Sequence, residues 1–186
     1  MGWLLPVGVP GGINSGFDGI PDGSGIVRLG DKLSCLDSGH YRLWRAAAAA
    51  PQAEQLIAWG TSQGIPDAAG RVHQLENAEL LIEEGPEVAM RIGGLALRLI
   101  GECLGNGGSV NPVFLVRGRN GTQLQVDAYL FEALLQSDGV GPVSVTCDKL
   151  DASQPRPGRR PSIESLVTSL PVLVRNEVLL LEAAIR

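Results

Sequence analysis

The chain has 186 residues, 44% of them hydrophobic, and a formal net charge of -5 at pH 7. No apolar run approaches the roughly 20 residues that a membrane-spanning helix needs. An acidic chain is also poorly suited to coating nucleic acid, because neutralising phosphates takes clustered lysine and arginine. Three widely spaced cysteines and two histidines argue against a disulfide framework and a zinc site. We therefore expect a globular protein with no metal and no cofactor.

Residues 1–25 hold eight glycines and three prolines, which is too many for regular structure. We expect an N-terminal arm here that packs, at most, as an extended segment. The start of the chain has no basic region, and Pro6 and Gly8 interrupt its apolar stretch, so it does not have the pattern of a signal peptide. This predicts a cytoplasmic protein, and the arginine-rich, lysine-poor composition is bacterial-like.

Residues 26–105 are expected to form a first winged-helix-like unit. Ile26–Leu29 and Leu33–Leu36 flank a glycine-bearing turn and predict a β-hairpin. Asp37 is placed to cap a helix, and further helices are expected over 52–63 and 68–78. Two more elements complete the unit: a second hairpin formed by 80–83 and 88–92, and a helix over 95–104, although alternating leucines there also allow a strand.

Residues 106–186 are expected to form a second such unit. A hairpin over 113–126 leads to Asp127, which repeats the capping position. The segment 148–161 is predicted to be an inserted loop, and Pro171 should kink or divide the last helix. The final strand, 178–181, has no expected partner strand, so it needs cover from the first unit or from a second copy in a homodimer.

Similar segments recur in the two halves. Leu36-Asp37 is matched by Val126-Asp127, and the stretch 77–83 is matched by 176–182. A repeated unit of strands and helices is a statement about architecture. The predicted fold class is α+β: two winged-helix-like units, each of short antiparallel strands and a three-helix cluster, packed as an internal duplication.

Catalytic signatures are not found in the sequence. A nucleophile needs a neighbouring base, and the only histidines are His40 and His73. The glycine-rich segment 101–107 lacks the Lys-Ser/Thr of a phosphate-binding loop. We therefore expect no enzymatic activity; an enzyme would require a deep pocket that brings one of these histidines to a cysteine.

The order of elements resembles PqqD-like winged-helix domains, which recognise leader peptides during the maturation of ribosomally made peptides. The resemblance covers about residues 26–92 and, faintly, 113–183, and includes the Leu36-Asp37 helix start and Tyr41-x-x-Trp44. It implies peptide capture by strand addition at Ile26–Leu29 or Leu33–Leu36, with the second unit as a degenerate partner. The candidate contacts for a peptide or protein partner are Arg28, Leu29, Leu33, Arg71, Gln74 and Asn77.

A tandem winged-helix transcriptional regulator is the alternative. The helix 68–78 would then read the major groove through Arg71, Gln74 and Asn77, and Arg156, Arg159 and Arg160 would contact phosphates. Acidic residues on or near the same helix oppose this hypothesis, and a solvated helix face is the better explanation of the polar residues. The peptide- or protein-binding module is the preferred interpretation.

Overall fold

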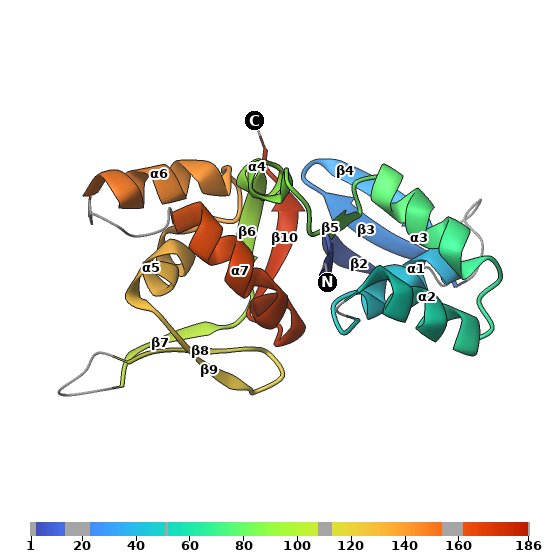
Figure 1. Cartoon of the computed structure of the whole chain (residues 1–186), viewed down its shortest axis with the longest axis horizontal. Coiled ribbons are helices and arrows are strands. Elements are labelled where there is room, and N and C mark those ends of the chain that lie inside the picture. The colour runs from blue at the N-terminus through green and yellow to red at the C-terminus, as the bar shows by residue number, and fades with distance from the viewer. Residues whose placement is uncertain (1–2, 14–22, 51, 108–112, 154–161, 186) are drawn as a thin grey trace. The chain divides into compact units, whose positions relative to one another are not determined.

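The computed structural model describes residues 3–13, 23–50, 52–107, 113–153 and 162–185. The chain forms two compact units, unit 1 (Met1–Pro86) and unit 2 (Glu87–Arg186) (Figure 1). The boundary expected between residues 105 and 106 is therefore wrong. Residues 87–105 belong to unit 2 because their two strands pair with strands of that unit.

Unit 1 combines two small antiparallel sheets with three helices. The strands β2, β3 and β4 form one sheet in that order, and β1 pairs with β5 in the other. The elements in chain order are β1 (Leu4–Pro6), β2 (Val9–Ile13), β3 (Gly25–Leu29), β4 (Lys32–Leu36), α1 (Ser38–Ala46), α2 (Ala53–Ser62), α3 (Ala68–Asn77) and β5 (Leu81–Glu83).

The N-terminal segment is part of the core of unit 1, so the expectation of an irregular arm is wrong for its described residues. Leu4 and Leu5 are at most 2% exposed, and the Trp44 indole donates a hydrogen bond to the Val7 carbonyl at 3.0 Å. The segment is ordered despite its glycines because burying the apolar side chains of β1 is favourable. These side chains complete a core that includes Tyr41 and Leu43 of α1.

Unit 2 has the same kinds of element. Its three-stranded sheet has the order β7, β8, β9, and β6 pairs with β10. The elements are α4 (Val88–Gly93), β6 (Leu95–Leu99), β7 (Glu102–Asn106), β8 (Phe114–Arg117), β9 (Gln123–Val126), α5 (Ala128–Gln136), α6 (Val143–Ser153), α7 (Ser162–Arg175) and β10 (Leu179–Ala183).

The β3–β4 and β8–β9 hairpins and the helices that begin after Asp37 and Asp127 confirm the sequence prediction. Three other expectations are wrong. Residues 88–92 form α4, in which Ile92 is buried while Met90 is 69% exposed, a one-sided helical pattern. The segment 95–104 forms strands, because Leu95–Leu99 pairs with β10. The final strand therefore has a partner strand within its own unit.

Two expectations about the last helices need correction. Helix α7 runs through Pro171 without being divided. Helix α6 extends to Ser153, so the first part of the expected loop 148–161 is helical, and its remainder lies outside the described residues.

After α4, which has no counterpart in unit 1, the elements of unit 2 follow the same order and pairing pattern as those of unit 1. Each has a β-bulge where its first sheet strand meets the second, at Gly12 in unit 1 and Gly105 in unit 2, both with positive φ. After the third helix, Glu79 and Glu177 both adopt left-handed conformations, with φ of 58° and 55°. Glu79 therefore corresponds to Glu177. The sequence match of 77–83 with 176–182 paired Glu79 with Val178 instead, one position further along the chain.

A glycine substitution tests the packing of unit 1. A β-carbon on Gly25 would overlap the Tyr41 ring, whereas one on Gly85 would meet open space. We expect Gly25→Ala to destabilise unit 1 by about 1–3 kcal/mol through overpacking, and Gly85→Ala to change little. Urea unfolding followed by tryptophan fluorescence measures this, because all three tryptophans lie in unit 1. Equal midpoints for the two variants would contradict the packing described.

Candidate functional site

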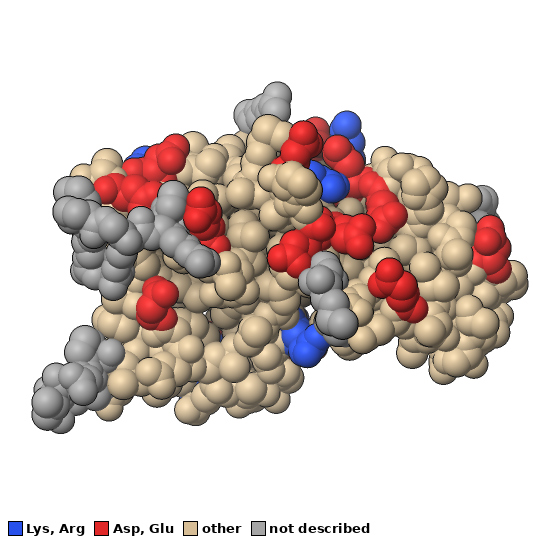
Figure 2. All heavy atoms as spheres, in the orientation of Figure 1, with Lys and Arg blue, Asp and Glu red and all other residues tan. Residues whose placement is uncertain are grey.

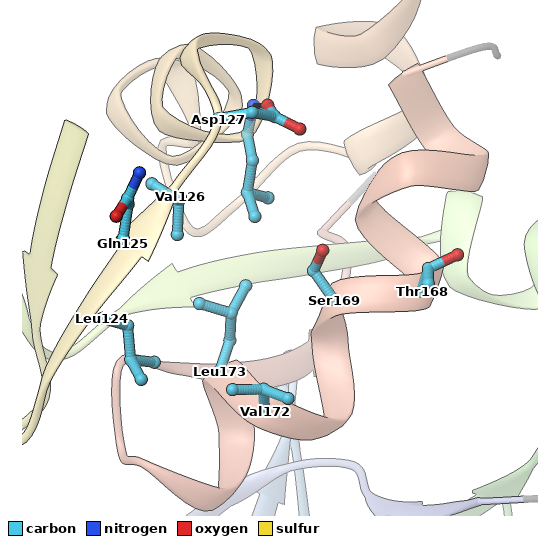
Figure 3. Close-up of a pocket in the computed structure, with 9 residues that line it drawn as sticks. Leu124, Gln125, Val126, Asp127, Thr168, Ser169, Val172 and Leu173 are labelled. Carbon is cyan, nitrogen blue, oxygen red and sulfur yellow. Dashed lines mark hydrogen bonds between the residues drawn. The ribbon is translucent and has the colours of Figure 1, made fainter. Parts of the chain in front are cut away.

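A groove of about 290 Å³ lies in unit 2 between strand β9 and helix α7, and we call it the β9–α7 groove (Figure 3). Its walls mix apolar and polar side chains: Leu130 and Leu173 are buried, and Val172 is 52% exposed although it is aliphatic. The groove is lined by Leu124, Gln125, Val126, Asp127, Leu130, Thr168, Ser169, Val172 and Leu173.

Strand β9 is the last strand of its sheet, so one of its edges has no partner among the described strands. The Gly118 N–H bonds the Thr122 carbonyl at 2.9 Å, next to the Arg117–Gln123 pair. Antiparallel pairs alternate in their hydrogen bonding, so the backbone polar groups of Gln123 and Gln125 point to the open edge. The side chains of Leu124 and Val126 lie on the same face of the strand, toward the groove (Figure 3).

One end of the groove is polar. Asp127 caps helix α5, with Oδ1 accepting the Leu130 N–H at 2.7 Å. The Ser169 hydroxyl donates to the Ser165 carbonyl at 3.0 Å, so its lone pairs remain as acceptors. Within the described part of the chain, no basic side chain forms an ion pair with Asp127. This end of the groove therefore offers hydrogen-bond acceptors and a negative charge.

The corresponding place in unit 1 can be identified from matched backbone bonds. Leu80 N–H bonds the Leu75 carbonyl as Val178 N–H bonds the Leu173 carbonyl, both at 2.9 Å. Counting back along each helix, Arg71 corresponds to Ser169 and Gln74 to Val172. Along the strand and first helix, Asp37 corresponds to Asp127, Cys35 to Gln125 and His40 to Leu130.

In unit 1 these positions form a polar bridge between α1 and α3. Arg71 Nη1 donates to Asp37 Oδ1 and Oδ2 at 2.6 and 2.7 Å, and its Nε donates to the Pro66 carbonyl at 2.9 Å. His40 Nε2 lies 2.7 Å from Gln74 Oε1. The side chains of Arg71 and His40 are 24% and 19% exposed. Side chains of unit 1 itself thus occupy the place that is a groove in unit 2.

The bridge changes the acidity of Asp37. Burial acts to raise the pKa of its carboxyl, but hydrogen bonds from Arg71 and from the His40 backbone and ring outweigh this effect, and the pKa lies below its ordinary value of 3.8. The carboxylate is therefore held in its charged form by a cation of the same unit.

The sequence-predicted contacts are only partly brought together. Arg71 and Gln74 join the bridge, and Asn77 is exposed at the end of α3. Arg28 and Leu29 lie on β3, the central strand, so Ile26–Leu29 is not an edge for strand addition. Leu33 lies on the edge strand β4 and is 70% exposed. Arg156, Arg159 and Arg160 lie outside the described residues.

The DNA-reading hypothesis loses its main contact in this arrangement. The Arg71 guanidinium is already bound by Asp37 and the Pro66 carbonyl, so reaching a base edge would break these bonds. On the face drawn in Figure 2, acidic side chains are more prominent than basic ones over the described residues. Negative charge opposes the approach of phosphates.

The described residues include no group of three His, Cys, Asp or Glu side chains that could hold a metal ion. His73 contacts Glu76 on its own helix at 3.6 Å, with 72% of its side chain exposed. None of the helices that the structure describes has the length and apolar character to cross a membrane.

Sequence reasoning missed the groove residues of unit 2. Leu124 and Val126 were assigned to a strand, but their proximity to Ser169 and Val172 arises from tertiary packing. The sequence did contain one signal: polar residues of unit 1 are replaced by smaller or apolar residues at the matched positions of unit 2. Aligning the two repeats one residue out of register along the third helix concealed these replacements. Comparisons with protein-family models, curated proteins and solved structures find no match to this chain.

The ion pair of Asp37 predicts an acid-dependent contribution to stability. Asparagine retains the helix cap, so Asp37→Asn removes mainly the charge. Because the folded pKa is lowered, the contribution is present above about pH 4 and is lost as pH falls toward the folded pKa. We expect the variant to be less stable at pH 7 by at most about 1 kcal/mol, since half of the Asp37 side chain is exposed, and equal to wild type in strong acid.

Urea midpoints by tryptophan fluorescence between pH 2 and 7 measure this difference. Asp31→Asn, in the exposed β3–β4 turn, is the charge-matched control and should leave the midpoint unchanged. A difference that fails to shrink between pH 4 and pH 2, or grows there, would contradict the proposed ion-pair contribution.

Proposed function

We propose that this chain is a non-enzymatic interaction module that binds an extended segment of a peptide or protein partner. The segment adds a strand to β9 and places side chains in the β9–α7 groove. The observation that carries this proposal is the coincidence of an open strand edge and a groove that contains apolar side chains on the same side of β9. Main-chain hydrogen bonds then supply affinity, and the groove supplies specificity.

The proposal assigns binding to unit 2, whereas the resemblance to PqqD-like domains implied an edge in unit 1. Strand β4 also has an open edge, but the bridge between Arg71, Asp37 and His40 takes the place of side-chain pockets there. A peptide at β4 would have backbone partners but would have to displace charged hydrogen bonds, which are among the stronger ones in proteins.

We further propose that both units are winged-helix-like and arose by internal duplication. The support is the shared sequence of strands and helices, with a bulge, an aspartate cap and a left-handed glutamate at matched positions. Features as specific as a non-glycine residue with positive φ rarely coincide by chance. Divergence after duplication explains why one unit keeps an open groove and the other does not.

A proline substitution on the strand edge tests peptide capture. The Gln125 N–H points to the open edge, so Gln125→Pro should fold but lose strand addition. We expect a random dodecapeptide library displayed on phage to yield binders of the wild-type chain whose affinity falls about tenfold or more with Gln125→Pro. Fluorescence anisotropy of the synthesised peptides, with Gln125→Ala as the control that keeps the N–H, measures the effect.

The matched variant in unit 1 is Cys35→Pro, and it should leave peptide affinity unchanged. Circular dichroism establishes that both proline variants fold. A library that yields no binder, or binders lost with Cys35→Pro and retained with Gln125→Pro, would overturn the assignment to unit 2.

A further inference from the structure

Asp37 and Asp127 hold matched positions in the two units but have different surroundings. In unit 1, both carboxylate oxygens of Asp37 accept from the Arg71 guanidinium. In unit 2, Ser169 stands at the position of Arg71, and the space in front of Asp127 is part of the β9–α7 groove. Unit 1 thus places a guanidinium of its own, that of Arg71, in front of this carboxylate.

The groove end around Asp127 accepts hydrogen bonds. The Ser169 hydroxyl already donates its hydrogen bond to the Ser165 carbonyl, and Asp127 keeps carboxylate lone pairs beyond the hydrogen bond that it accepts from the Leu130 N–H. A ligand group in this place must therefore bring donors and, to be favourable, positive charge. The net charge of -5 on the chain also favours a basic ligand.

We propose that the segment captured by unit 2 presents an arginine whose guanidinium pairs with Asp127, in the role that Arg71 fills in unit 1. This inference rests on the proposed function and specifies the chemistry of its partner. Guanidinium suits the position better than ammonium because its planar fork can donate to both oxygens of one carboxylate. In unit 1, Arg71 pairs with the matched carboxylate of Asp37, and its Nη1 lies 2.6 and 2.7 Å from the two oxygens.

The rest of the groove sets the sequence around that arginine. Alternate residues of an extended segment point to the same side, so residues two positions from the arginine also face α7. The groove wall offers them Leu124, Leu130 and Leu173, which are apolar. The preferred segment is therefore extended, with an arginine and an aliphatic residue separated by one position.

The replacement of Gly39 in unit 1 by Tyr129 in unit 2 affects where the guanidinium of the ligand can lie. A β-carbon on Gly39 would lie 2.9 Å from Arg71 Nη1, and Tyr129 holds the matched position in unit 2. A ligand guanidinium in unit 2 therefore has to avoid the Tyr129 β-carbon, which has no counterpart on Gly39. The Tyr129 hydroxyl bonds the Leu150 carbonyl at 3.4 Å, which directs the ring toward α6 and leaves the groove open.

Labelled decapeptides with alternating valines test the inference. Arginine is placed in turn at each position that shares the valine face, and citrulline, which is neutral and of the same shape, replaces it in a matched set. Fluorescence anisotropy with the full chain should give, at one position, about tenfold tighter binding for arginine than for citrulline. The difference should shrink as salt is raised from 50 mM to 500 mM, because the groove end is open to solvent.

Three variants identify the groups involved. Asp127→Asn keeps the helix cap and should bind the arginine peptide no better than the citrulline peptide. Ser169→Arg supplies the guanidinium from the chain itself, as in unit 1, and should weaken binding of the arginine peptide about tenfold. Asp148→Asn, which removes an exposed charge on α6, is the control and should leave affinity unchanged.

The outcomes separate the two proposals. Peptides that bind in a manner sensitive to Gln125→Pro, with no preference for arginine over citrulline at any position, overturn the arginine and leave peptide capture standing. An arginine preference that survives Asp127→Asn also overturns it, since another acid would then be the partner. If no peptide of either set binds and the display library yields none, peptide capture itself is overturned.

Discussion

An aspartate at the junction of strand and helix fixes the geometry of each unit. Asp37 and Asp127 end the outer strand of a three-stranded sheet and cap the helix that follows, which sets the angle at which the chain leaves the sheet. The third helix packs beside this junction. The carboxylate therefore lies at one end of the space between the outer strand and the third helix. The side chain of the third helix that faces the carboxylate decides whether this space is filled or open.

The two units differ at this position, although each has a three-stranded sheet followed by three helices. In unit 1, arginine, glutamine and histidine side chains satisfy one another across the helices, a polar network of the kind that fixes a structure when every member is paired. In unit 2, serine, valine and leucine take those places. A groove and an internal polar bridge are thus the alternatives at these matched positions, and the size and charge of the side chains decide between them.

Local signals made part of this architecture predictable. The turn glycines, the capping aspartates and the three- and four-residue apolar spacing of the helices act over a few residues, and the structure confirms the elements they predicted. Pairings between distant segments were not predictable in this way: Leu4–Pro6 pairs with Leu81–Glu83, and Leu95–Leu99 with Leu179–Ala183. The groove depends on the same long-range packing, because Ser169 and Val172 meet β9 only when the whole unit is assembled.

The three thiols of the chain differ in accessibility, with a practical consequence. Burial raises the pKa of the Cys103 thiol and, together with the nearby acids Asp151 and Asp148, raises that of Cys147 to about 11, so both are poor nucleophiles. Cys35 is exposed on the outer strand of unit 1. A maleimide dye will therefore attach first at Cys35, the counterpart of Gln125, and report on the edge of one unit while the other remains unlabelled.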